Sequence, residues 1–463
     1  STLQLLTGLT ISSLSGPSSS FTVNGTLDAG TFIINGGATN GSFILASGAT
    51  LKSSNTNGIV STTVGTISNT IATRTFNDAA NYEFYGGAAV TNTSFPNSVM
   101  NNLTISNTAG VTQGGAITVN GNLTIASGAA FTTSANAIGL KGNWVNNGGT
   151  LTTSNTVTLN GTSAQSYTNT GTNTFNNLTL NNANGLLLNN NLNVGSALTL
   201  TAGKVTMGAN NVTTGSISGS STAYLITDGV GQFNITPPSA ATTIFPVGVS
   251  ASSYDPVSVN PTNSVAFSSN VKATANAGDY SPAINNFALA GPRQWLVSAT
   301  GPGLTVLTLT NGDGMYTPSM PYVIGHSNGM AWDEIPATFS SNTWTATTST
   351  FSPFGAGTQG AFEMPTCVPP SFVSITPSTQ TNCQGAPSTN IVVSATGDGL
   401  MYQWYQDNDG MGNNGTLIMG ETNATFTPPT AAAGTFKYYC EISGDCAPVA
   451  YSTYSEVIVT PSV

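Results

Sequence analysis

The sequence predicts an all-β protein in which a parallel β-helix, or β-solenoid, is followed by two β-sandwich modules. Three observations lead to this fold class: an internal repeat without gaps, a shorter strand-and-turn period, and a composition without helix signals. No stretch of the chain carries apolar residues at the i, i+3, i+4, i+7 spacing of an amphipathic helix over several turns. We therefore expect almost no helix.

The internal repeat consists of two segments that align without a gap at an offset of 75 residues. They are MNNLTISNTAGVTQGGAITVNGNLTI at 100–125 and FNNLTLNNANGLLLNNNLNVGSALTL at 175–200. Apolar residues recur at matching positions, as in Leu103 and Leu178, and Gly110 matches Gly185 at a turn. A repeat unit that cannot bury its apolar face alone must stack on its neighbours, so the repeat predicts a solenoid.

A shorter period of 19 to 21 residues separates three similar segments. They begin at Ile117, Ile138 and Val157 and read ITVNGNL, IGLKGNW and VTLNGT. Each alternates apolar with small residues, as a strand with one buried face does, and then reaches Asn or Gly, which suit tight corners. This length fits two or three short strands per turn of a parallel β-helix, with stacked polar residues hydrogen-bonded along the corners. An ordinary sandwich with similar hairpins is the alternative.

Changes of composition along the chain suggest where the domains meet. The solenoid is expected over residues 1–215, with FTVNGTL at Phe21 as its first clear turn. Residues 1–20 are atypical, as in a segment that caps the array or pairs with another molecule. Prolines then become frequent, and runs such as AYLITDG and PVSVNPT lie between turn signals. Residues 216–365 are therefore predicted to form a β-sandwich.

Residues 366–463 are predicted to form an immunoglobulin-like sandwich. A proline-rich join, PTCVPPSF, precedes strand-like runs such as NIVVSATG and GTFKYYCEISGDC. Trp404 lies on the expected central strand, and Tyr438 stands two residues before Cys440. This arrangement matches the buried tryptophan and the tyrosine corner of immunoglobulin-like domains.

All four cysteines fall in this last module, and we consider each of them a disulfide candidate: Cys367, Cys383, Cys440 and Cys446. An even number confined to one small module indicates disulfides in an oxidising compartment, with all three connectivities left open. Zinc is the competing interpretation, which the absence of a C-x-x-C pair and of a nearby histidine disfavours. We expect no metal ligands among the cysteines.

The charge composition argues against two classes of partner. Only 5% of the residues are charged, the net charge is −10, and the 7 basic residues are scattered. Nucleic acid binding requires clustered Lys and Arg, so no nucleic acid partner is expected. No run of about 20 apolar residues occurs, so we expect no membrane span. The first residues lack the basic region of an intact signal peptide, as a mature exported chain would.

No catalytic residue is expected. The one histidine of the sequence, His326, lies in VIGHSNGM without a nucleophile motif, and we expect it at the surface. Asp333 and Glu334 are adjacent, so on a strand they would point to opposite faces and suit an acid–base pair poorly. We therefore predict that the chain is not an enzyme.

Two weaker binding signals remain. Asp407, Asp409 and Asn413 place oxygen ligands close together in a loop-like run, as Ca²⁺ loops do, although no bidentate glutamate follows. We favour a polar hairpin tip there, and Ca²⁺ is the one cofactor considered. Trp332 and Trp344 are interpreted as core anchors of the middle module, with a glycan-binding platform as the alternative.

Several short motifs extend the argument beyond composition. They are LNGTSAQ at 159–165, FNNLTL at 175–180, IFPVGVSASSYDPVSV at 244–259 and TFSPFGAG at 350–357. These motifs, with the last module, resemble the repeat regions and following domains of large secreted surface proteins of Bacteroidetes. The resemblance implies export, commonly by the type IX route, and roles in adhesion, gliding or surface structure.

The sequence as a whole predicts a non-enzymatic extracellular protein of a bacterial cell surface, either adhesin-like or a subunit of a self-assembling filament. Faces with few charges can pack without desolvating ions, and edge strands can join copies by strand addition. Surface glycans and other surface proteins are the further expected partners. The alternative is a carbohydrate-binding surface protein; a polysaccharide-cleaving β-helix is disfavoured because the predicted solenoid contains few acids.

Overall fold

The structure is a computed structural model of the chain, and it is all-β with two short 3-10 helices in its described part. These helices are η1 (Ala277–Asp279) and η2 (Phe287–Leu289). The described residues are 2–11, 19–37, 41–61, 65–93, 95–227, 230–314, 316–362, 368–407, 414–444 and 448–462. The chain divides into two compact units, Ser1–Glu363 and Met364–Val463, and each is described by itself.

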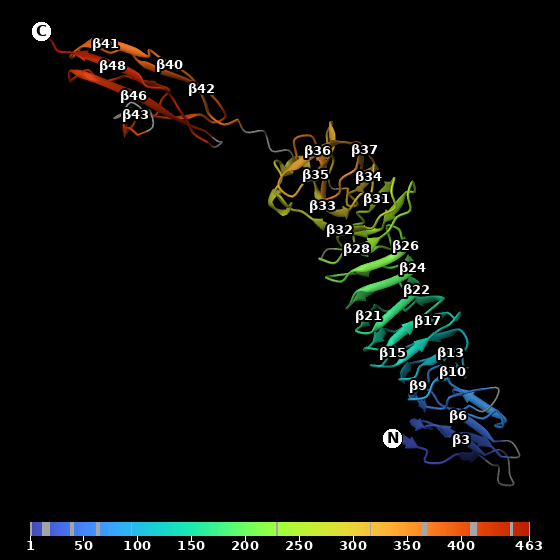
Figure 1. Ribbon diagram of the computed structural model, residues 1–463. Coiled ribbons are helices and arrows are strands. Elements are labelled where there is room, and N and C mark those ends of the chain that lie inside the picture. The colour runs from blue at the N-terminus through green and yellow to red at the C-terminus, as the bar shows by residue number, and fades with distance from the viewer. Residues whose placement is uncertain are drawn as a thin grey trace. The chain divides into compact units, whose positions relative to one another are not determined.

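The first unit begins with a parallel β-solenoid of about eleven turns (Figure 1). Its longest ladder, here the first ladder, is a 12-stranded sheet in which all neighbours run parallel. Its strands are β1 (Thr2–Gln4), β4 (Thr26–Asp28), β7 (Thr50–Ser53), β9 (Asn81–Gly86), β12 (Leu103–Asn107), β15 (Leu123–Ile125), β18 (Trp144–Asn146), β21 (Gln165–Asn169), β23 (Leu186–Leu188), β25 (Val205–Thr206), β27 (Leu225–Ile226) and β30 (Val247–Gly248). The predicted solenoid is confirmed.

Two further ladders complete the turns. The second ladder contains β10 (Val90–Thr93), β13 (Val111–Gln113), β16 (Ala130–Thr132), β19 (Thr150–Thr152) and the first part of β22 (Thr172–Asn181). The third ladder contains β11 (Val99–Met100), β14 (Ile117–Val119), β17 (Ile138–Leu140), β20 (Thr156–Leu159), the later part of β22, and the later parts of β24 (Leu192–Ala202) and β26 (Val212–Ser218). The first turns add β2 (Leu9–Ile11), β3 (Ser20–Val23), β5 (Ile34–Gly36), β6 (Ser42–Leu45) and β8 (Thr73–Phe76), also in parallel pairs.

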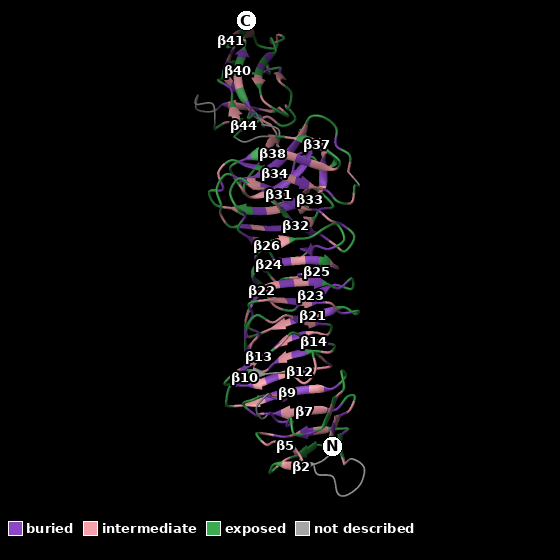
Figure 2. Cartoon of the chain, turned by 90° about the vertical axis from the view of Figure 1, so that its right-hand side faces the viewer, coloured by how far each residue is buried: buried purple, intermediate pink, exposed green. Residues whose placement is uncertain are grey.

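The short period of the sequence is one turn of the solenoid. Ile117 is in register with Ile138, and Ile138 with Val157, so the three similar segments stack directly in the third ladder. The side chains of these three residues are buried, whereas the next residue along each strand is half-buried. Figure 2 shows this alternation as changes of colour along the solenoid strands. The period-two pattern therefore predicted the buried face correctly.

The 75-residue alignment, in contrast, does not join equivalent strands. Leu103 lies in β12 of the first ladder, whereas Leu178 lies in β22 of the third ladder. Gly110 and Gly185 are both at corners with positive φ, 101° and 81°, but at corners between different ladders. All three ladders use the same alternation and the same corner residues, so a sequence match does not identify the face.

Asparagine side chains connect successive turns at one corner. Asn102 donates from Nδ2 to Asn81 Oδ1 at 2.8 Å, and the Asn122 N–H donates to Asn102 Oδ1 at 2.7 Å. The Asn143 N–H donates to Asn122 Oδ1 at 2.8 Å, and the Ser166 N–H to Asn143 Oδ1 at 2.8 Å. The polar stack expected from the sequence is present, and it satisfies corner backbone groups that strand pairing leaves open.

β28 still pairs in parallel with β26, and from there on the strands of the first unit pair antiparallel, except for β30 at the end of the first ladder. The sheet that contains the second and third ladders continues through β28 (Phe233–Ile235), β32 (Phe267–Ala273), β33 (Ala290–Ala299), β35 (Tyr322–Ser327), β36 (Trp332–Pro336) and β39 (Pro353–Thr358). A separate five-stranded sheet contains β29 (Thr243–Phe245), β31 (Val257–Pro261), β34 (Thr305–Thr310), β37 (Thr338–Ser340) and β38 (Thr343–Thr348). Side chains of both sheets belong to the hydrophobic core of the solenoid, among them Trp295 and Trp344. Packing therefore continues across residue 215 without a break.

The second unit has its own core between two sheets. One sheet contains β40 (Ser371–Thr376), β42 (Ile391–Thr396) and β45 (Thr425–Phe426). The other contains β41 (Thr379–Cys383), β43 (Met401–Asp407), β44 (Thr416–Leu417), β46 (Gly434–Ser443), β47 (Ala450–Tyr451) and β48 (Ser455–Thr460). Trp404 and Tyr438 are both buried in this core, as the sequence predicted.

Candidate functional site

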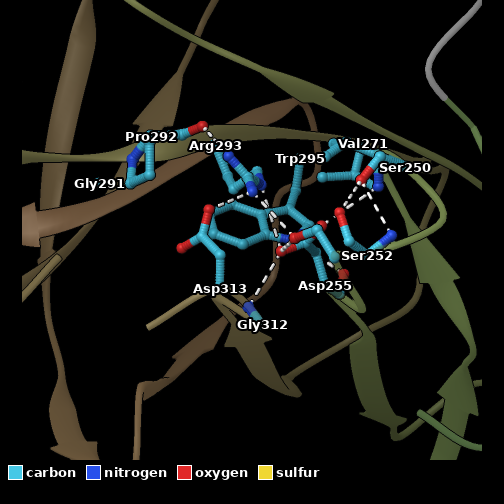
Figure 3. Close-up of polar contacts among 12 residues, drawn as sticks. Ser250, Ser252, Asp255, Val271, Gly291, Pro292, Arg293, Trp295, Gly312 and Asp313 are labelled. Carbon is cyan, nitrogen blue, oxygen red and sulfur yellow. Dashed lines mark hydrogen bonds and ion pairs between the residues drawn. The ribbon is translucent and has the colours of Figure 1, made fainter. Parts of the chain in front are cut away.

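An arginine between two aspartates forms a buried charge cluster in the antiparallel part of the first unit (Figure 3). Arg293 lies on β33, Asp255 precedes β31, and Asp313 follows β34. The Nε atom of Arg293 is 3.2 Å from Asp255 Oδ1 without hydrogen-bond alignment, and Nη2 donates to Asp313 Oδ2. Asp255 is fully buried and Arg293 is 6% exposed. The cluster therefore joins three separate segments through charges withdrawn from water.

The carboxylate of Asp255 is also held by hydrogen bonds. The N–H groups of Gly312 and Val249 donate to it at 3.0 and 3.2 Å, and Ser253 Oγ donates at 2.9 Å. Trp295 donates from Nε1 to the carbonyl oxygen of Asp255 at 3.2 Å. This network leaves the carboxylate little freedom to move.

The cluster does not have the chemistry of a catalytic site. Its one hydroxyl nucleophile, Ser253, is 4% exposed, donates to Asp255 and accepts from Arg293 Nη2 at 2.9 Å. A nucleophile that is buried and engaged on both sides cannot reach a substrate. We interpret the cluster as a structural connection between β33 and the segments around β31 and β34.

The two candidate tryptophans are core residues. Trp332 is 4% exposed and donates from Nε1 to the Pro282 carbonyl oxygen at 2.8 Å. Trp344 is fully buried and donates from Nε1 to the Gly357 carbonyl oxygen at 3.3 Å. The expected core role is the one found. Neither ring faces solvent, so the alternative of a glycan platform at these two residues is wrong for this structure.

His326 and the neighbouring Glu334 are likewise structural. His326 was expected in a surface turn, but it lies inside β35, is 9% exposed, and contacts the Phe354 ring at a centroid distance of 5.2 Å. Burial lowers its pKa below the ordinary value of 6.5. Glu334 accepts the Gly360 N–H at 2.9 Å and the Phe362 N–H at 3.0 Å, so it anchors the segment after β39.

Two of the disulfide candidates can be placed. Cys383 is exposed at the end of β41, opposite Thr460, whereas Cys440 is fully buried in β46. Asn382 is level with Gly434 at the start of β46, and Cys383 lies one residue beyond it, so Cys440 is seven residues away along the strand, about 23 Å at about 3.3 Å per residue. A disulfide requires Cα atoms within about 7 Å, which excludes a Cys383–Cys440 bond. Cys367 and Cys446 are outside the described residues.

The candidate calcium loop is described only at its first residue. Asp407 ends β43, is 7% exposed, and stands opposite Lys437 of β46. Asp409 and Asn413 lie outside the described residues. Where residues are described, no group of three or more His, Cys, Asp or Glu side chains is placed to hold a metal ion.

A groove of about 450 Å³ lies where the third ladder ends, and sequence analysis did not predict it. It is lined by residues 215–219, 235–238, 242–244 and Pro246. None of these residues is charged, and the apolar ones are Ile217, Ile235, Pro237, Pro238, Ile244 and Pro246. Pro237 and Pro238, which come shortly after the end of β28, are the sequence feature that could have indicated this end of the ladder.

Comparison with known protein families finds a match in the C-terminal part of the chain. A family model described as Domain of unknown function (DUF8696) matches residues 373–461, within the second unit. No curated protein and no solved structure matches the chain. In the described part of the chain, no helix has the length and apolar character needed to cross a membrane.

Proposed function

We propose that the chain is a non-enzymatic structural or adhesive protein of a bacterial cell surface, adhesin-like or a subunit of a self-assembling filament. The observation that carries this proposal is the first ladder, which runs through 12 parallel strands. At about 4.8 Å between strands, the ladder extends about 50 Å along the solenoid axis. Backbone hydrogen bonds along this direction, with the asparagine stack beside them, resist bending and extension.

The solenoid surface also suits lateral contact. Exposed positions are mostly Thr, Ser, Asn and Gly, because only 5% of the residues of the chain are charged. Lys52 and Glu83 are neighbours on β7 and β9 and form an ion pair at 3.1 Å. Surfaces of this kind can approach another protein or a polysaccharide without desolvating isolated charges.

The proposal includes finer assignments. The antiparallel part of the first unit would be a β-sandwich and the second unit an immunoglobulin-like sandwich; the cores shared between two sheets support both. Export by the type IX route is supported by the resemblance of the sequence motifs to secreted Bacteroidetes proteins.

Electron microscopy of the purified full chain, with sedimentation velocity and a cell-adhesion assay, tests the proposal. Filaments or concentration-dependent oligomers support a filament subunit, and binding of the monomer to cells supports an adhesin. A chain that stays monomeric up to about 100 μM and binds no surface contradicts both. Release of reducing ends from a glycan panel would contradict the non-enzymatic assignment.

A carbohydrate-binding role is the second candidate, supported by the outer face of the larger sheet in the second unit. Tyr405 and Tyr439 stack at 5.2 Å with an interplanar angle of 7°, and Tyr451 packs on Tyr439 at 6.2 Å. Tyr451 is 43% exposed and stands opposite Glu441, so a ring and a carboxylate are available together. Glycan-array binding that is lost in Tyr451→Ala supports this role, and no binding by the unmodified chain contradicts it.

A further inference from the structure

The third ladder ends at β26 with one edge open. On one side, Ser216, Ile217 and Ser218 pair with β24. On the other side of β26, β28 pairs with Val212 and Thr213 at the beginning of the strand, and it does not reach residues 216–218. No strand of the described residues pairs with the second edge of residues 216–218. An edge of this kind presents backbone N–H and C=O groups that no strand pairs with, although Thr214 Oγ1 donates to the Ser216 carbonyl oxygen at 2.8 Å.

Two prolines explain why the ladder stops at this point. β28 ends at Ile235, and Pro237 and Pro238 follow where the chain would continue along β26. Proline has no backbone N–H and cannot donate to a neighbouring strand. The chain turns away and returns as β29, an edge strand of the five-stranded sheet. β26 and β29 approach each other at one end and line opposite sides of the space that remains between them.

The space is the groove of about 450 Å³, within the range of ordinary ligand pockets. Ile217 is half-buried at its base, and Ile244 of β29 is 53% exposed at its rim. The absence of charge in the lining disfavours charged ligands, because their desolvation would not be compensated.

Earlier turns show what occupies the equivalent position. Val157 is covered by Leu178, Leu178 by Leu198, and Leu198 by Ile217, each on a strand of the next turn. Each covering strand carries an aliphatic residue between two small or polar ones, as in NNLTLN and SALTLT. At Ile217 no strand of the described residues pairs in this way, because β29 reaches the groove but pairs with β31.

We propose that this groove accepts an extended, uncharged peptide strand from another polypeptide, which pairs with residues 216–218 and places an aliphatic side chain over Ile217. Backbone pairing at a sheet edge provides affinity in this mode of recognition, and pockets for alternate side chains provide specificity. The proposal does not rest on filament formation or adhesion, because it concerns only the groove and its ladder.

The test uses a labelled peptide with the sequence of residues 176–181, acetyl-NNLTLN-amide, titrated with the full chain by fluorescence anisotropy. We expect saturable binding that weakens at least tenfold for the peptide NNLPLN, which lacks one N–H donor. We expect a similar loss for Ile244→Asp at the rim of the groove. Val306→Asp is the matched control, because Val306 is 43% exposed on the same sheet but does not line the groove.

A photo-crosslinking form of the peptide provides a readout that does not depend on the folding of a variant. Crosslinks that map to residues 215–219 or 242–246 support the proposal. Absence of saturable binding at 1 mM peptide overturns it, as does equal affinity for the two peptides or for the two variants. Crosslinks confined to other segments also overturn it, and so does a groove that binds a neutral oligosaccharide but no peptide.

Discussion

Replacing Arg293 by methionine provides a sharp test of the buried charge cluster. Methionine keeps an unbranched side chain of comparable reach but removes the guanidinium group. Asp255 would then remain fully buried beside β33 without its cation, although Gly312 and Val249 would still donate to it. The variant therefore isolates the electrostatic contribution of Arg293 from most of its packing.

The expected loss of stability follows from the burial of the pair. Removing one partner of a buried ion pair costs about 3–5 kcal/mol, because the other charge is left uncompensated. For a cooperative region of about 150–250 residues, each kcal/mol shifts the melting temperature by about 2–4 °C. We therefore expect the melting temperature to fall by about 10 °C. Lys52→Met is the control: its ion pair with Glu83 is partly exposed, and such pairs contribute about 0–1 kcal/mol.

Thermal unfolding followed by tryptophan fluorescence is a suitable assay, because Trp295 donates to the backbone of Asp255 and reports on the cluster. The double variant Arg293→Met, Asp255→Asn should regain part of the lost stability, since the unpaired charge is removed while one amide oxygen still accepts. A shift for Arg293→Met no larger than that for Lys52→Met would refute the reasoning. So would a double variant that is less stable than the sum of the two single changes.

Three further predictions concern the core, the histidine and the thiols. Leu123→Ala, at a fully buried position of β15, should destabilise the solenoid by about 2–5 kcal/mol in urea unfolding, whereas Leu187→Ala, at a 49% exposed position, should cost clearly less. Equal losses would contradict the burial pattern. Burial lowers the pKa of His326, so the unfolded chain binds the proton at a higher pH than the folded chain, and the free energy of unfolding should fall as the pH drops below 6.5. His326→Phe should make this fall with pH less steep, and an unchanged pH dependence would assign it to other groups. The exposed Cys383 should react rapidly with a thiol reagent, whereas Cys440 should react only after denaturation, because burial shields it and raises its pKa to about 11. Equal reaction rates of the two thiols in the native state would contradict this prediction.

Local patterns in the sequence determined the strands and the turn length of the solenoid. Ile117, Ile138 and Val157 were predicted to be equivalent from a spacing of 19 to 21 residues, and they stack in register. This succeeded because the two-residue alternation of a strand follows directly from backbone geometry. Burial of Trp404 was predicted from a different pattern, the immunoglobulin-like combination of a tryptophan on a central strand with Tyr438 two residues before Cys440.

Features that depend on which segments meet in space were decided only by the tertiary structure. Leu103 and Leu178 match in sequence but lie in different ladders, because all the ladders share one alternation. The charge cluster joins Asp255, Arg293 and Asp313 from three separate segments, which no spacing in the sequence relates. The open edge of β26 is also a non-local feature, since it depends on how the described strands pair: none of them pairs with the second edge of residues 216–218. Sequence alone thus determined the repeating element, and long-range packing decided where its ladders end and what surrounds those ends.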